Sequence, residues 1–295
     1  MKQIPASIWT LTVGVVVTLI ALWAGRQNIF FPEQASAQAP LVDNFFNLMF
    51  MIAVALFLLV AGTVLFFAIY FRQRPGDEGD GIPLEGSFAL EAYWTLVPAV
   101  IVIFLGVYSV QVFAQMGGFA TGGGGGNHLL MSHHRHHHTQ LVSHGRDAEA
   151  PESQAKYGLG GTEPADVTVT VTGMQYAWIF NYPEGIVSGE LHIPVNKTVQ
   201  LNIKAADVIH SFWVPQFRLK QDAIPGHTTE LRFTATKVGA YPIVCAELCG
   251  AYHGAMRTQV YVHTQEEYEQ WLAANQVAQN SDLSEAVAVQ TDQMN

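Results

Sequence analysis

Two long stretches of almost unbroken hydrophobic residues, 45–71 and 93–113, dominate the first half of the chain. About 20 apolar residues in a helix cross the ~30 Å hydrocarbon core of a bilayer, so each stretch is long enough to span it. The polar segment between them carries Arg72 and Arg74 at its start. Because basic loops stay in the cytoplasm, residues 38–116 are predicted to form a two-helix transmembrane hairpin whose ends lie on the outer face.

A third apolar run, residues 8–24, follows a basic start at Lys2 and precedes an Ala-Ser-Ala sequence that ends at Ala37. A basic start, an apolar centre and small residues at the cleavage site are typical of a secretory signal peptide. We therefore expect residues 1–37 to be a signal peptide cleaved near Ala37. The run is long for a signal peptide, so an uncleaved membrane anchor is the alternative.

From residue 164 onward the hydrophobic period changes to two. Hydrophobic and polar residues alternate in four stretches, 167–172, 199–204, 231–234 and 260–263. Such alternation is typical of half-buried strands, and prolines and glycines separate the stretches. Residues 164–276 are therefore predicted to form a β-sandwich that ends in a short helix, with a polar tail over 277–295.

The segment before the sandwich, residues 117–163, has a biased composition. Five consecutive glycines occupy 122–126, and the sequence HHRHHH occupies 133–138. Glycine-rich segments are flexible by composition, so we interpret this segment as a linker. A histidine-rich store of metal for delivery is the alternative.

Composition agrees with a membrane protein. Only 13% of the 295 residues are charged, against about 25% in soluble proteins. The net charge of −10 argues against nucleic acid as a partner.

The sequence CAELCGAYHGAM, residues 245–256, concentrates soft metal ligands. It holds the only two cysteines of the chain, Cys245 and Cys249, followed by His253 and Met256. Such ligands favour copper, zinc or iron–sulfur clusters over hard cations, and structural zinc sites do not use methionine. We therefore predict a copper site whose two thiolates are enough to bridge two ions. A disulfide or a redox-active cysteine pair is the alternative.

A copper site of this kind needs another histidine from elsewhere in the chain. The candidate is His210, which lies upstream in the sequence DVIHSFWVP and is predicted to be on a short strand. With one ligand on an earlier strand and the others on a later loop, the site would be fixed between two elements of a rigid sandwich.

Together, the motif C-x-E-x-C-x3-H-x2-M and the stretches LEAYWTLVPA, DVIHSFWVP, KQDAIPG and GMQYAWIFNYP resemble subunit II of haem–copper cytochrome c oxidases, and the cyanobacterial members in particular. This resemblance covers about 230 residues, from the first span to the last strand. It implies a two-helix transmembrane hairpin followed by an all-β, cupredoxin-like Greek-key sandwich.

The resemblance also assigns ligands. It implies that the dinuclear copper centre of the family, CuA, is held by His210, Cys245, Glu247 through its backbone carbonyl, Cys249, His253 and Met256. The two cysteines would bridge the ions, and Met256 would be a weak ligand. The Glu247 side chain would bind magnesium at the boundary with subunit I, which suits a carboxylate.

Other positions carry roles that the resemblance suggests. Glu91, just before the second span, is either an interfacial carboxylate or a proton-collecting group; it matches the entrance of a proton pathway into subunit I. Where many relatives place an exposed tryptophan that receives electrons, this chain has Tyr176, with Trp178 nearby. Asp207 is a candidate to orient a ligand, and Asp222 is either a turn residue or a polar group near the subunit boundary.

The implied function is a one-electron relay. A soluble carrier, cytochrome c-like or plastocyanin-like, would reduce the copper centre on the periplasmic or thylakoid-lumen side of the membrane. The electron would pass to haem in subunit I, with subunit III as a further partner, and oxygen would be reduced to water with proton translocation. The chain would be inactive as an oxidase by itself.

Three alternatives remain at this point. A quinol oxidase subunit would lack the copper ligands, and a nitrous oxide reductase would be a much larger chain without the hairpin. A non-enzymatic, membrane-anchored copper-binding or copper-delivery protein would need neither Glu91 nor the Glu247 carboxylate.

His227 also stands where relatives often have arginine.

Overall fold

The computed structural model describes residues 6–27, 30–76, 79, 86–118, 157–161 and 164–276. The glycine run, the histidine tract and the polar tail lie outside these residues. The chain divides into two compact units, one made of Met1–Pro32 and Pro40–Val112 and the other of Glu33–Ala39 and Phe113–Asn295.

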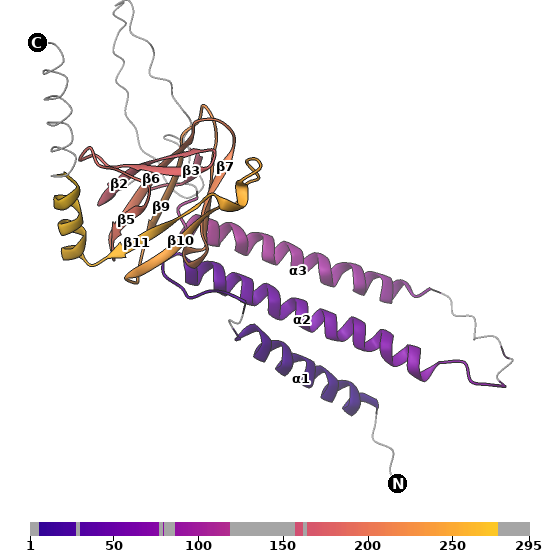
Figure 1. Cartoon of the computed structure of the whole chain (residues 1–295). Helices are drawn as coiled ribbons and strands as arrows, with labels where there is room; N and C mark the ends of the chain where they lie inside the picture. The colour runs from indigo at the N-terminus through magenta and orange to yellow at the C-terminus, as the bar shows by residue number, and fades with distance from the viewer. Residues whose placement is uncertain are drawn as a thin grey trace, which may run out of the picture. The chain divides into compact units, whose positions relative to one another are not determined.

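The first unit is helical. In the described part of the chain, three helices are long and apolar enough to cross a membrane: α1 (Ala6–Gly25), α2 (Ala39–Tyr70) and α3 (Phe88–Gln115) (Figure 1). The two predicted spans are found within α2 and α3. The predicted count of two is not confirmed, because the apolar run near the N-terminus forms a third helix of the same kind.

The second unit is a β-sandwich of two sheets (Figure 1). The six-stranded sheet has the order β1-β9-β6-β2-β3-β4, with bounds Tyr157–Leu159, Thr229–Thr234, Thr198–Ala205, Val167–Met174, Ala177–Asn181 and Val187–Ser188. The five-stranded sheet has the order β5-β11-β10-β7-β8, with bounds Leu191–Pro194, Arg257–His263, Gly239–Cys245, His210–Val214 and Leu219–Ala223. A helix over residues 265–276 follows β11.

The predicted alternation decides which side chains form the core. Val169 and Val171 of β2 are fully buried, and so are Leu201 and Ile203, their register partners on the parallel strand β6. Successive side chains of a strand point to opposite faces, so the intervening polar residues face away from the core. Between the two sheets the core is filled by large side chains, among them Phe180, Phe212, Phe217 and Phe233.

Two segments that were expected to lie outside the sandwich are part of it. β1 lies in the segment interpreted as a linker and pairs in parallel with β9. The Ala-Ser-Ala sequence at the expected cleavage site is also part of the sandwich: Ala35 is completely buried, and Ser36 forms a bridge with Ala235. Both additions depend on pairing with β9 or the residue after it, which local sequence does not reveal.

Backbone hydrogen bonds tie this N-terminal segment to the sandwich. Ala35 donates to the carbonyl of Gln216 at 3.0 Å and accepts from Thr236 at 2.9 Å, and Ala37 donates to Thr234 at 2.9 Å. The Ser36 hydroxyl donates to the carbonyl of Phe217 at 2.9 Å. Residues 35–37 therefore act as structural residues of the second unit.

Candidate metal centre

The loop that carries most of the candidate ligands connects β10 to β11, and β10 pairs with β7 on its other side. Cys245 is the last residue of β10 and pairs with Phe212 of β7, two residues after His210. The Cys245 amide donates to the carbonyl of Met256 at 3.1 Å, which closes the loop at its base. Sheet register thus brings one end of the loop beside the strand that carries the distant histidine.

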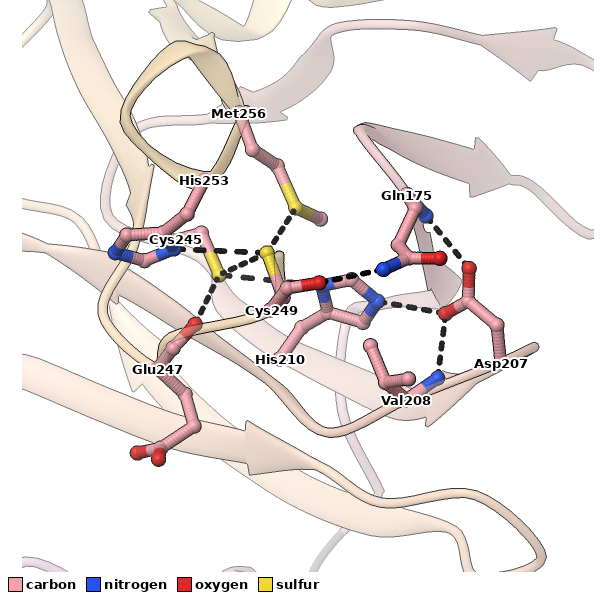
Figure 2. Close-up of polar contacts among 9 residues, drawn as sticks. All are labelled: Gln175, Asp207, Val208, His210, Cys245, Glu247, Cys249, His253 and Met256. Carbon is pink, nitrogen blue, oxygen red and sulfur yellow. Dashed lines mark hydrogen bonds and ion pairs between the residues drawn. The ribbon is translucent and has the colours of Figure 1, made fainter. Parts of the chain in front are cut away.

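The potential ligand atoms converge on the two sulfur atoms (Figure 2). The Sγ atoms of Cys245 and Cys249 lie 3.9 Å apart, and His210 Nδ1 is 4.0 Å from Cys245 Sγ. On the other side, Cys249 Sγ lies 3.5 Å from His253 Nδ1 and 3.8 Å from Met256 Sδ. The carbonyl oxygen of Glu247 is 3.3 Å from Cys245 Sγ. The structure thus brings together all six residues predicted as copper ligands.

The donor set and its spacing fit a metal centre. Both cysteines are free thiols, and both are buried together with His210. A sulfur–sulfur distance of 3.9 Å lets one ion contact both sulfurs at the ~2.3 Å of a metal–thiolate bond. Sulfur and imidazole donors suit copper, so the chemistry of the pocket agrees with the predicted ion.

Burial makes the Cys249 thiolate costly to form unless a cation is present. Burial, followed by the neighbouring Cys245 thiol, raises the pKa of Cys249 to about 11. The Cys249 thiol of the metal-free protein therefore stays protonated at neutral pH. A positive ion stabilises the adjacent thiolate and opposes this effect.

Asp207 orients the His210 ring. Its Oδ1 atom lies 2.8 Å from Nε2 of His210, so Nε2 carries the proton it donates and Nδ1 is left facing the sulfurs (Figure 2). Burial acts to raise the pKa of Asp207, but hydrogen bonds from His210, the Gln175 amide and the Val208 amide outweigh it, and the pKa is lowered. The carboxylate that fixes the ring is therefore ionised, as is common beside metal-ligating histidines.

The aromatic residues near the loop differ in exposure. Trp178 is only 2% exposed and packs edge-to-face against the His210 ring, with centroids 6.0 Å apart. It therefore cannot be an exposed contact for an electron carrier. Tyr176 packs edge-to-face against Tyr252 at 5.4 Å, and Tyr252 is 68% exposed. Sequence reasoning missed Tyr252, although it directly precedes His253.

Known families match both units. The model for the transmembrane domain of cytochrome C oxidase subunit II matches residues 24–112, and the model for its periplasmic domain matches residues 186–262. A relative named cytochrome c oxidase subunit 2, from Thermostichus vulcanus, is 57% identical over 287 residues, which are 94% of this chain and 88% of the relative. The chain belongs to the cytochrome c oxidase subunit II family.

Further relatives carry the same name. Cytochrome c oxidase subunit 2 of Synechocystis is 45% identical over 289 residues, which cover 96% of this chain and 86% of the relative. Among solved structures, the periplasmic domain of subunit II of the cytochrome oxidase of Bradyrhizobium japonicum is 33% identical and covers 39% of this chain, with a TM-score of 0.38. The resemblance inferred from the motifs is confirmed by the sequence relatives, and the chain is a membrane protein with a periplasmic domain.

The remaining candidates of this subunit II family member lie outside the ligand cluster. The Glu247 carboxylate is exposed and points away from the sulfurs (Figure 2). Asp222 accepts hydrogen bonds from the Ser211 hydroxyl at 2.7 Å and from Lys220 at 2.9 Å, so it is tied to the residue that follows His210. Glu91 lies in the first turn of α3 and is exposed.

Proposed function

We propose that this chain receives electrons for cytochrome c oxidase at a dinuclear copper centre, CuA. The supporting observation is the convergence of four further potential ligands on the two buried thiols of Cys245 and Cys249, which form no disulfide. When bound, the copper pair would take one electron at a time from a soluble carrier and pass it to haem in subunit I, where oxygen is reduced to water with proton translocation.

Each ligand contributes by its chemistry and its place. Cys245 and Cys249 would provide the bridging thiolates, and the rings of His210 and His253 would each complete one side. The Met256 Sδ atom lies 3.8 Å from Cys249 Sγ, and the Glu247 carbonyl oxygen lies 3.3 Å from Cys245 Sγ. Each would therefore serve as the weak ligand of a different ion. His210 and Cys245 are held by paired strands, which limits ligand movement when the oxidation state changes.

Electrons would enter through the Tyr252–Tyr176 pair. The exposed Tyr252 ring can meet a docked carrier, which would be a cytochrome c-like or plastocyanin-like protein, and it directly precedes the ligand His253. Trp178 is buried against the His210 ring, so it would take part in electron transfer within the domain without contacting the carrier.

The membrane topology follows from the charges beside the helices. Arg72 and Arg74 would hold the loop between α2 and α3 in the cytoplasm, and the copper domain would lie on the periplasmic or thylakoid-lumen side. α2 and α3 would form the hairpin, and α1 would be a signal peptide or an additional anchor. Glu91, at the cytoplasmic end of α3, would sit at the entrance of the proton pathway into subunit I.

Glu247 would have a second role through its side chain. Its carboxylate is exposed and directed away from the sulfurs, and carboxylate oxygen suits a hard cation such as magnesium. This ion would lie at the boundary with subunit I, while subunit III would complete the assembly.

Copper content and electron paramagnetic resonance of the full chain in detergent test the proposal. After loading with copper and removal of excess ion, we expect two copper ions per chain and a spectrum in which one unpaired electron is shared by both nuclei. Cys249→Ser should abolish the shared signal, because a serine hydroxyl does not replace a bridging thiolate. One copper or a variable number per chain would instead support a delivery protein, and a Cys249→Ser variant that keeps the shared signal would refute the bridging assignment.

A further inference from the structure

The turn between β2 and β3 contacts the metal-binding loop directly. Gln175 and Tyr176 form this turn. The side-chain amide of Gln175 donates to the backbone carbonyl of Cys249 at 2.6 Å, across 74 residues of sequence (Figure 2). The carbonyl that accepts this bond belongs to one of the two proposed bridging cysteines.

The same residue also holds the partner of the distant histidine. The backbone amide of Gln175 donates to Asp207 Oδ2 at 2.7 Å, while Asp207 Oδ1 accepts from His210 at 2.8 Å. Gln175 therefore links Cys249 on the loop and His210 on β7, which come from separate parts of the sandwich.

The loop approaches this turn too closely for a side chain at Gly250. A Cβ atom there would lie 2.5 Å from the Tyr176 hydroxyl and 2.8 Å from Gln175 Nε2, and the φ angle of +135° favours glycine. Glycine, which has no Cβ, thus occupies the position where the turn packs against the loop. Tyr176 adds its edge-to-face contact with Tyr252, so the fit extends along the loop towards His253.

We propose that Gln175 is a positioning residue of the metal centre, which holds the Cys249 thiol in place relative to His210 before and after metal binds. This inference rests on the proposed function of the site. Its physical basis is that groups that orient ligands reduce the cost of assembling the site, and their loss typically lowers metal affinity by about 10- to 100-fold.

The test compares Gln175→Leu with Gln200→Leu in the full chain in detergent. Leucine has a similar size but donates no hydrogen bond, and the backbone bond to Asp207 is kept. Gln200 is a matched control because its side-chain amide also donates to a backbone carbonyl, that of Leu201 at 3.4 Å, on strand β6. In competition with a chelator of known affinity, we expect the Gln175 variant to bind copper about ten-fold more weakly or worse, with an altered visible spectrum, and the control to behave like the parent.

A second readout uses the metal-free protein. If Gln175 holds the loop, its replacement should speed the reaction of Cys249 with a thiol reagent while the near-ultraviolet circular dichroism of the sandwich stays unchanged. Because Gln175 is exposed, turnover alone would not separate positioning from carrier docking; neither of these readouts involves a carrier. Should Gln175→Leu fail to fold, Gln175→Glu keeps the shape and removes the donor at neutral pH.

The outcomes separate the two proposals. Unchanged copper affinity and unchanged thiol reactivity in a folded Gln175 variant would overturn the positioning role. If the parent protein itself does not bind two copper ions, the proposed function fails instead. Thiol reactivity that rises in the metal-free variant would still support the positioning of Cys249 in that case.

Discussion

The Asp207 carboxylate accepts a hydrogen bond from Nε2 of His210 at 2.8 Å, and this leaves Nδ1 of the same ring facing the sulfur of Cys245. Removal of the carboxylate should release the ring. We expect Asp207→Ala to lower copper affinity by about 10- to 100-fold, as measured by competition with a chelator of known affinity. Asp166→Ala is the control, since Asp166 caps Thr198 on β6. Equal copper affinity in both variants would show that the pair does not orient the ligand.

The N-terminal segment supports a prediction about processing. Residues 35–37 are hydrogen-bonded into the sandwich, and Ala35 is completely buried. Cleavage after Ala37 would remove these contacts, so we expect the mature protein to begin before Glu33. Intact-mass measurement and N-terminal sequencing of the protein from its membrane would check this. A mature chain that begins at Gln38 would contradict it.

The tyrosine pair supports a prediction about electron uptake. In the assembled oxidase, Tyr252→Ala should slow reduction by the soluble carrier, because it removes the exposed ring beside His253. Tyr252→Phe should keep most of the rate, since the ring stays. Stopped-flow reduction at low carrier concentration gives the comparison, and copper content must match the parent in both variants. Equal rates for Tyr252→Ala and the parent would place the entrance of electrons elsewhere.

A histidine pair beneath the C-terminal helix supports a prediction about pH. His192 Nδ1 lies 2.8 Å from His263 Nε2, and the His192 ring stacks on Trp271 with centroids 4.2 Å apart. Burial, with a further contribution from His263, lowers the pKa of His192 to about 4, and burial also lowers the pKa of His263. Glu190 lies 3.9 Å from His192 on its other side.

The direction of the pH effect follows from these shifts. An unfolded histidine has a pKa of about 6.5, so between roughly pH 6.5 and 4 the unfolded chain binds more protons than the folded one. The free energy of unfolding should therefore fall as the pH drops through this window. His192→Gln should reduce the slope, whereas His227→Gln, at an exposed position, should not. The pH dependence of stability is measured from unfolding midpoints, followed by near-ultraviolet circular dichroism at several pH values. Equal slopes of stability against pH for the parent and both variants would contradict the prediction.

The sandwich core supports a prediction about stability. Phe180 is completely buried and packs edge-to-face near Phe212. Phe180→Ala should cost about 3–5 kcal/mol of unfolding free energy, because it removes buried surface and leaves a cavity. Denaturant unfolding of the full chain in detergent, followed by near-ultraviolet circular dichroism, gives the value. A loss below about 1 kcal/mol would indicate that the core closes around the missing ring.

Much of this protein can be predicted from local patterns. Apolar runs predict helices that span a membrane, and the period of two predicts β2, β6, β9 and β11, because each signal depends on residues within one element. Candidate metal ligands can also be proposed from sequence, since thiolate, imidazole and thioether chemistry is carried by the residue types themselves.

Only the tertiary structure decided how distant residues meet. Gln175 and Cys249 lie 74 residues apart, and Ser36 and Phe217 lie 181 apart, yet each pair is hydrogen-bonded. The burial of Trp178, the exposure of Tyr252 and the inclusion of residues 35–37 in the sandwich likewise depend on which strands pair and in which register. Such contacts arise when the two sheets close over a shared core, so no stretch of local sequence contains them.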